Sequence, residues 1–353
     1  MSNEPNEAFH WYEILAFSLL TMATLCLCVC AGSVAIPIWD TLRVIVRACL
    51  GLSVQEGLPT AIILSVRLPR VLAVALTGAS LSLCGACMQG LLRNPLADGS
   101  TLGVSSGASL GAVAAMALGV SLPALPFGST ALMAMLFAFA SLVLVLALSY
   151  MADHTMSTQT LILMGVIFSM FASSLMSLLI TFSGEKLKSI TFWTMGSLAG
   201  CGYESVLLLL VVFVLCGGVL LLHSRELNAF SLGEDAARHI GVSVRRVKLT
   251  VMIMVSALIG VCVSIGGCIG FVGLTMPHMA RMLTGPNHRR LLPASAFAGA
   301  VFLMLCDLAA RTLLNPIELP IGIITSMVGA ACFIAVYFRT RGGRSGACSK
   351  SKT

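Results

Sequence analysis

The chain has 353 residues, of which 58% are hydrophobic and 10% are charged, and its formal net charge is +7. Soluble globular domains carry about 25% charged residues, so this composition excludes a soluble fold and predicts an integral membrane protein with no nucleic-acid partner. The 13 cysteines stand singly within apolar segments. Neither a disulfide framework nor a metal site is expected from them, and no cofactor is predicted for this chain.

Apolar stretches long enough to cross a bilayer recur along the whole sequence. The first exceeds 20 residues and follows a segment without Lys or Arg, which indicates a retained membrane anchor rather than a cleaved signal. The segment 271–283 is shorter and contains Pro277, and we count it as a further crossing. The nine other predicted spans lie at about 14–36, 69–92, 101–120, 129–150, 159–182, 204–223, 248–271, 291–313 and 320–338. The prediction is an all-α, polytopic membrane protein with about ten transmembrane helices in a single domain, 1–353.

Basic residues indicate the orientation of these spans. Ten crossings would leave both termini on one side, and the loops and tail on that side hold 14 of the 21 Lys and Arg residues. The positive-inside rule therefore predicts that both termini are cytoplasmic. Arg67 and Arg70, one helical turn apart, would then face outward, where they either anchor a helix end by snorkelling or serve a specific contact.

A weak internal repeat appears when the chain is shifted by about 182 residues. It pairs Gly78 with Gly260, Ser82 with Ser264, Gly85 with Gly267, Leu92 with Leu274 and Pro95 with Pro277. An odd number of predicted crossings separates the two copies, so they would run in opposite directions. Inverted repeats of this kind are typical of transporters that work by alternating access.

The sequence offers little that could power transport by itself. Secondary transporters place ionisable residues inside the membrane, and only Asp307 lies well within a predicted span. Arg311 follows four residues later on the same helical face, which favours a structural ion pair. None of the five lysines follows a glycine, as a nucleotide-binding G-K-[ST] motif requires. Any ATPase would therefore be another chain.

The longest polar loop, "NAFSLGEDAARHIGVSVRR", predicts a short helix between two spans. Ser231 and Glu234 have the spacing of a capping box, Asp235 strengthens the first turn, and Gly241 can end the helix in a left-handed cap. One face of this helix would consist of Ala236, Ala237 and Ile240. Such a face either docks into a partner's groove or belongs to a solvated connecting helix.

Four separated segments share a pattern with a known family: "RLPRVLAVALTGASLSLCGACMQGLLRNPLADGSTLGVSSGA", "GEDAARHIGV", "GFVGLTMPHMARMLTG" and "ELPIGIITSMVGAACFIAVYF". They resemble the permease subunits of the bacterial ATP-binding-cassette (ABC) importers for iron-siderophores, haem and cobalamin, the FecCD or BtuC-type family. The resemblance runs from about Arg67 to the last span. It implies an inverted-repeat, BtuC-like bundle in the bacterial inner membrane, with ATP and Mg²⁺ bound by a partner ATPase.

The resemblance also implies partners and sites. The permease would form a homodimer or a close heterodimer, with two cytoplasmic ATPase subunits below and a periplasmic or lipid-anchored substrate-binding protein above. The binding protein would dock on Arg67, Arg70 and Arg311, with Arg311 shared between Asp307 and the partner. The helix coupling the permease to the ATPase would comprise Ser231, Gly233, Glu234, Asp235, Ala236, Ala237, Ile240 and Gly241.

The resulting prediction is a permease subunit, not itself an enzyme, that moves an iron-siderophore, or else haem or cobalamin. Two alternatives belong to other classes. A proton-coupled secondary transporter or exporter would work without an ATPase, and a structural membrane scaffold would carry no substrate.

Overall fold

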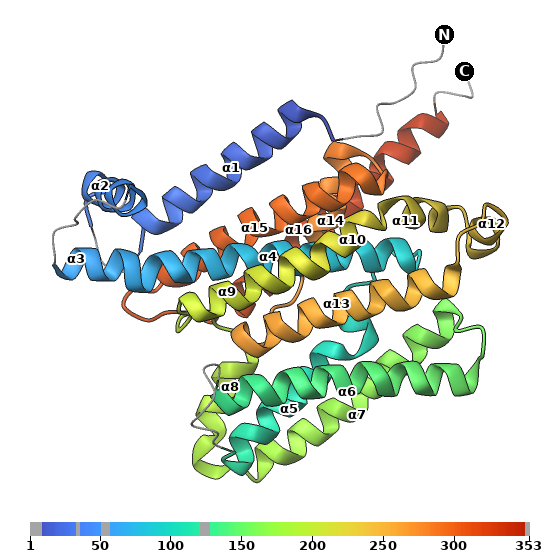
Figure 1. Ribbon diagram of the computed structural model, residues 1–353, viewed down its shortest axis with the longest axis horizontal. Coiled ribbons are helices and arrows are strands. Elements are labelled where there is room, and N and C mark those ends of the chain that lie inside the picture. The colour runs from blue at the N-terminus through green and yellow to red at the C-terminus, as the bar shows by residue number, and fades with distance from the viewer. Residues whose placement is uncertain (1–8, 33–35, 51–56, 121–127, 350–353) are drawn as a thin grey trace.

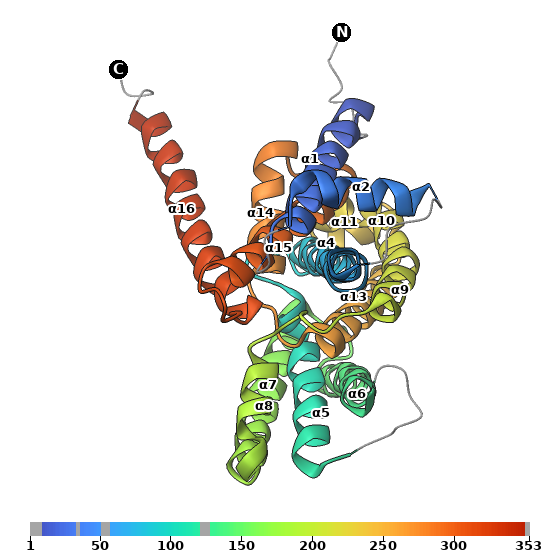
Figure 2. The same cartoon turned by 90° about the vertical axis from the view of Figure 1, so that its left-hand side faces the viewer.

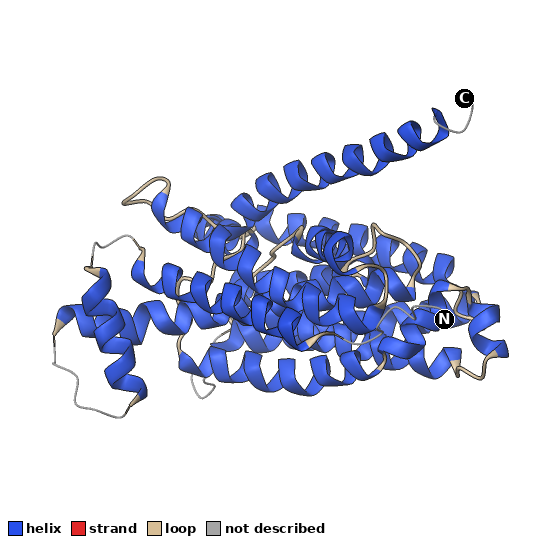
Figure 3. Ribbon diagram, turned by 90° about the horizontal axis from the view of Figure 1, so that it is seen from above, coloured by secondary structure: helices blue, strands red, loops and turns tan. Residues whose placement is uncertain are grey.

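The computed structural model describes residues 9–32, 36–50, 57–120 and 128–349, and all regular structure within these ranges is helical (Figure 3). The helices are α1 Trp11–Cys30, α2 Ile38–Cys49, α3 Leu58–Ala61, the π-helix η1 Ile62–Arg67, α4 Leu68–Leu91, the 3₁₀ turn η2 Gly99–Leu102, α5 Val104–Leu118, α6 Gly128–Ala152, α7 Thr158–Thr181, the 3₁₀ turn η3 Gly184–Lys186, α8 Leu187–Thr194, α9 Tyr203–Val212, the π-helix η4 Phe213–Gly217, α10 Gly218–Leu222, α11 Ser224–Ser231, α12 Glu234–His239, α13 Val244–Gly266, α14 Val272–Thr284, α15 His288–Thr312 and α16 Ile321–Ser349. The all-α prediction is confirmed.

The long helices run side by side along the longest axis of the molecule (Figure 1). One end carries α2 and α3, and we call it the α2 end. The other carries α11 and α12, together with the start of α1 and the far end of α16, and we call it the α12 end. Both described chain ends therefore lie at the same end, as an even number of crossings requires.

A continuous helix of 33 residues, Pro59–Leu91, lies at the centre of the bundle. In the most apolar 18-residue stretch of this helix 78% of the residues are buried, compared with 17% in the corresponding stretch of α1. Small residues permit this position, because a methyl group at Gly78 would collide with the carbonyl of Gly299 in α15, and one at Gly299 with that of Gly78. The helix contributes to two clusters of buried apolar side chains, one shared mainly with α13 and the other with α15. This sharing is compatible with the predicted single domain.

The predicted start of this span at residue 69 is wrong. Apolar residues from Leu58 onward already form helix, and the π-helix η1 precedes Pro69 and accommodates it. Arg67 and Arg70 therefore lie within the helix and not at its first turn.

A broken segment joins α13 to α14. The predicted span 248–271 ends early, at Gly266, and the residues up to Phe271 are not helical. Inside α14, Pro277 cannot donate to the carbonyl of Gly273. The amide nitrogen Nε2 of Gln89, from α4, donates to that carbonyl at 3.3 Å and to the carbonyl of Leu274 at 3.2 Å. A side chain of the central helix thus satisfies the carbonyl that the proline leaves free.

Seven helices in the described chain are long and apolar enough to cross a membrane. Two shorter apolar helices, Val104–Leu118 and Ile321–Ala335, and the 13-residue α14 lie at the remaining predicted positions. The count of ten crossings is therefore not established. The amphipathic helix α2 was not among the predicted elements. It lies across the end of the bundle (Figures 1 and 2).

The helices α4 and α13 run in opposite directions (Figure 1), as an inverted repeat requires. The proposed pairing is less regular at its far end. Gly85 lies inside α4, whereas its counterpart Gly267 follows the last residue of α13. The repeat therefore stays a prediction beyond the direction of these two helices.

Candidate functional site

Five charged side chains meet near the α2 end, and we call them the arginine cluster: Arg67, Arg70, Asp307, Arg311 and Glu318. Arg70 donates to Asp307 Oδ1 from Nε at 3.1 Å and from Nη2 at 2.9 Å. Its Nη1 donates to Glu318 Oε2 at 2.8 Å. The guanidinium thus joins α4 to α15 and to the loop that follows α15. Its planar fork is suited to two carboxylates at once.

Arg311 and Arg67 complete the cluster. Arg311 Nε lies 3.0 Å from Asp307 Oδ2, within ion-pair distance although not aligned as a hydrogen bond. Arg311 Nη2 also donates to the carbonyl of Cys28 at 3.0 Å, and Arg67 Nη1 donates to the carbonyls of Val29 and Cys30, each at 3.1 Å. The two arginines therefore hold the end of α1 against α4 and α15.

The predicted ion pair between Asp307 and Arg311 is confirmed, since the two side chains lie within ion-pair distance. The structure adds Arg70 as a second partner, 237 positions from Asp307, which the sequence did not indicate. None of the three arginines is more than 6% exposed. This burial follows from Asp307, itself 1% exposed, because a carboxylate in the interior requires compensating cations. The docking role predicted for the arginines stays a prediction, and in the single chain their partners are internal.

At the α12 end, the predicted capping box is wrong. Ser231 is the last residue of α11, and its hydroxyl donates to the carbonyl of Asn228 at 2.6 Å. The next helix begins at Glu234 after Gly233, with no side-chain cap. The Ser-x-x-Glu spacing spans the junction between two short helices, so the serine satisfies the end of the first and not the start of the second.

The predicted left-handed cap at Gly241 is confirmed. Gly241 has φ of 90°, its amide donates to the carbonyl of Arg238, and the amide of Val242 donates to the carbonyl of Ala237, each at 3.0 Å. These two bonds form a Schellman motif, in which glycine is favoured because other residues are strained at positive φ. The cap fixes the direction in which the chain enters α13.

Buried polar contacts tie α12 to the body of the protein. Glu234 Oε1 lies 2.6 Å from Lys248 Nζ in α13 and accepts a hydrogen bond from the Thr158 hydroxyl, at the start of α7, at 3.0 Å. Lys248, which is 2% exposed, also donates to the carbonyl of Met156 at 3.0 Å. We call these four residues the α12 tether. It connects a surface helix directly to α7 and α13.

The exposed face of α12 differs from the predicted one. Ala237 is fully buried against the body of the protein, and Ala236 is half-buried. Ile240, 64% exposed, does face outward, and Leu232, 70% exposed, stands beside the start of the helix. Two large apolar side chains thus project into solvent from a loop that is otherwise polar, and Leu232 was not among the predicted residues.

The turn between α6 and α7 also lies at this end. Hydrogen bonds from the Thr155 hydroxyl, and then from the backbone amides of Ser157 and Thr155, hold the pKa of Asp153 well below its usual range. Arg245 lies over the ring of Tyr150, 5.3 Å from its centroid. These contacts order the segment that contains Met156, the carbonyl partner of Lys248.

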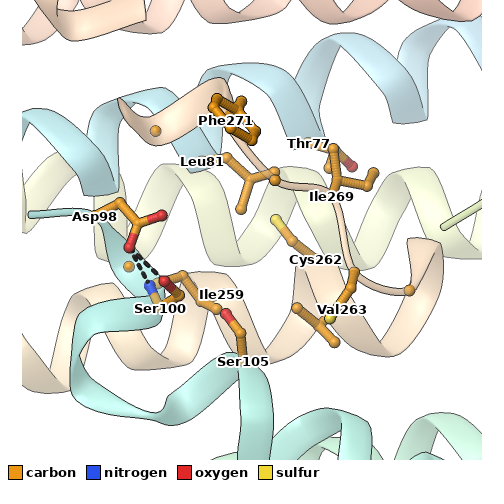
Figure 4. Close-up of a pocket in the computed structure, with 15 residues that line it drawn as sticks. Thr77, Leu81, Asp98, Ser100, Ser105, Ile259, Cys262, Val263, Ile269 and Phe271 are labelled. Atoms are coloured by element: carbon orange, nitrogen blue, oxygen red, sulfur yellow. Dashed lines mark hydrogen bonds between the residues drawn. The ribbon is translucent and has the colours of Figure 1, made fainter. Parts of the chain in front are cut away.

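A cavity of about 130 Å³ lies in the middle of the bundle, beside the broken segment between α13 and α14 (Figure 4). Its lining includes Thr77, Asp98, Ser105 and Cys262. The Thr77 hydroxyl is buried without a hydrogen-bond partner, whereas Asp98 accepts hydrogen bonds from the amide and hydroxyl of Ser100. Apolar side chains form most of the lining, and these few polar groups stand among them.

The surface of α7 differs from that of the segment 205–222. Four hydroxyl-bearing residues of α7 are exposed: Ser173, Ser174, Ser177 and Thr181. The exposed residues of the segment 205–222 are all leucine or valine. Polar side chains in membrane helices face a bundle interior or a water-filled space more often than lipid. Figure 2 shows α7 and α8 on the same side of the molecule as α16, which leans away from the bundle.

Comparison with known proteins covers almost the whole chain. The model of the FecCD transport family matches residues 20–339. An uncharacterized ABC transporter permease, YvrB of Bacillus subtilis, is 45% identical over 94% of this chain and 95% of its own length. The molybdate import permease MolB of Haemophilus influenzae is 42% identical over 80% of this chain and 82% of its own.

A solved structure is similar in fold. It is described as an inward-facing conformation of a metal-chelate type ABC transporter, and it matches with a TM-score of 0.80 at 35% identity. The match covers 94% of this chain and 100% of the other.

Proposed function

Because this chain belongs to the FecCD transport family, whose members are the membrane permeases of ABC importers, we propose that it moves an iron-siderophore across the bacterial inner membrane, with both termini cytoplasmic. Permeases of this family are not enzymes, and the ATPase is a separate subunit, which on this proposal binds ATP and Mg²⁺. Haem and cobalamin are the alternative substrates. The molybdate permease and the metal-chelate transporter are both named for metal species, which supports a metal-containing substrate here.

The main support for this proposal is that the α12 tether holds a helix with an exposed apolar surface. Leu232 and Ile240 project from the α12 end, where a partner could cover them. Glu234 binds both Lys248 and the start of α7, so a displacement of α12 is transmitted to a long helix. ATP-driven transport requires a docking helix that is rigidly linked to the bundle. A passive scaffold has no need of such a link.

The path would lie along α7 at an interface with a second permease, as a homodimer or a close heterodimer. The exposed hydroxyls of α7 support this, because a path for a large polar chelate needs a wettable wall. The exposed leucines and valines of the segment 205–222 suit contact with lipid instead.

At the α2 end, a binding protein would engage the arginine cluster through Arg70. The Glu318 side chain is 37% exposed, so its bond to Arg70 lies at the edge of the cluster. A carboxylate of the binding protein could replace Glu318 there, while Asp307 keeps its place inside. Three guanidinium groups and two carboxylates leave the cluster with one net positive charge, which attracts an acidic partner.

The test is reconstitution in proteoliposomes with the co-encoded ATPase and binding protein. We expect uptake of a ferric siderophore that requires ATP and both partners, with haem, cobalamin and molybdate measured in parallel. Uptake driven by a proton gradient without the ATPase would establish the secondary transporter instead. A complete lack of flux for a correctly inserted protein would favour the scaffold.

A further inference from the structure

A second cavity, of about 430 Å³, opens at the α12 end between α11 and α13. Its lining includes Glu226 from the first turn of α11, Ile240 at the end of α12, and Arg246 and Thr250 from α13. No residue of the α12 tether lines it. The cavity therefore lies beside the exposed surface of α12 and is separate from the contacts that hold the helix in place.

Glu226 is the unusual group in this lining. Its Oε2 atom is buried and has no hydrogen-bond partner. Throughout the described chain, no Lys, Arg or His nitrogen forms an ion pair with it. The residue lies in the first turn of a helix, on the side of the partial positive charge of the helix end. A buried carboxylate oxygen without a donor is costly, so the site is electrostatically incomplete.

The remaining lining suits a long basic side chain. Val242 and Val247 offer apolar surface against which the methylene stem of a lysine or arginine can pack. Arg246 shares the lining but is itself exposed and forms no ion pair among the residues that the structure describes. The carboxylate of Glu226 thus has no ion-pair partner among the described residues, although Arg246 and His223 line the same cavity.

We propose that this cavity is a socket for a lysine or arginine side chain of the ATPase subunit, whose charged end reaches Glu226. This inference rests on the proposed function. The partner is assigned from continuity: Ile240 belongs both to the lining and to the exposed surface of α12, so a protein seated on α12 also covers the mouth of the socket. The incoming cation supplies the donor that Glu226 lacks, in a charge-assisted bond.

The test compares binding of the purified, co-encoded ATPase to permease variants in nanodiscs. Glu226→Gln keeps the shape of the side chain and removes its charge, and we expect about tenfold weaker binding, the typical value of one charge-assisted bond. Ser243→Trp, at the exposed edge of the socket, should weaken binding similarly by filling the space. Glu204→Gln, an exposed glutamate at the α2 end, is the matched control and should bind like wild type.

The outcomes separate this inference from the function on which it rests. If the wild type does not bind the ATPase, the proposed function fails. If the wild type and Glu226→Gln bind it equally, only the socket is wrong. Carbodiimide coupling, which joins a carboxylate to a contacting lysine amine, adds a direct readout for lysine. If Glu226 couples to an amine-bearing lipid and Glu226→Gln leaves ATPase affinity unchanged, the socket belongs to the membrane and the inference is overturned.

Discussion

Asp307 organises the arginine cluster, because it is the buried anion that two arginines share. Its Oδ1 accepts both donors from Arg70, and its Oδ2 lies within ion-pair distance of Arg311. Glu318 contributes one bond at the edge of the same cluster. Both carboxylates thus bind the guanidinium of Arg70, but Asp307 is buried and Glu318 is partly exposed. Mutating each in turn therefore compares the effect of burial on the stability that a carboxylate contributes.

We expect Asp307→Asn to lower the free energy of unfolding by about 3 to 5 kcal/mol, because two buried guanidinium groups lose their shared anion. Glu318→Gln should cost less than about 1 kcal/mol, as is usual for a partly exposed pair. Unfolding in mixed detergent micelles measures both. Equal losses for the two variants would contradict the central place of Asp307.

The same glutamate gives a test of docking. If a carboxylate of the binding protein replaces Glu318 on Arg70, then Glu318→Gln removes an internal competitor and should tighten binding of the purified binding protein by about threefold or more. The gain should shrink as salt is added. Arg70→Lys, which loses the planar fork, should weaken binding. Unchanged affinity in Glu318→Gln would remove Arg70 from the docking surface.

At the scale of elements, α12 depends on one of two adjacent acidic residues. Glu234 is bonded to Lys248 and Thr158, whereas the Asp235 side chain is 91% exposed and makes only a 4.0 Å contact with Arg238. Both lie in the first turn, and both would favour the helix N-terminus by charge alone. Only Glu234 belongs to the α12 tether, so the two acids are expected to have different roles. They should therefore be replaced one at a time, because a double replacement would not distinguish a less stable α12 from a lost connection between α12 and α7.

We predict that Glu234→Gln lowers substrate-stimulated ATP hydrolysis by roughly fivefold, the effect of about 1 kcal/mol of lost coupling between α12 and α7. Asp235→Asn should stay near the wild-type rate. Hydrogen exchange at α12 gives a second readout and should rise in the first variant only. If both variants retain full activity, the tether does not transmit motion.

For the whole molecule, the question is which surfaces meet water and which meet lipid. Ser174 in α7 and Val211 in α9 are both exposed. Each lies seven or eight residues from the end of its helix nearer the α2 end, Thr181 for α7 and Tyr203 for α9. Both positions therefore lie at a similar distance along the helix from that end. Exposed hydroxyl groups as well as large apolar side chains lie near the first, whereas the exposed neighbours of the second are all leucine or valine.

We expect a water-soluble thiol reagent to label Ser174→Cys in membranes and to leave Val211→Cys unlabelled, with the chain's partly exposed native cysteines replaced by serine. Labelling of Ser174→Cys should fall when ATP and the binding protein are added, if the path closes around it. Equal labelling at both positions would contradict a path along α7.

The sequence by itself determined the features that depend on composition and local pattern. Long apolar runs dictate helices in a membrane, because no other structure satisfies the backbone there without closing a barrel. The Asp307 and Arg311 pair and the cap at Gly241 were also predictable, since each depends on residues within five positions of one another in one helix or turn. Family motifs supplied the remaining functional expectations.

Only the tertiary structure decided the contacts between distant segments. Arg70 meets Asp307 across 237 positions, and Glu234 meets Thr158 across 76, so no local periodicity could reveal either contact. The same holds for Gln89, which satisfies a carbonyl that a proline in another helix leaves free. A sequence pattern specifies which face of a helix is polar, but packing alone decides which partner that face meets.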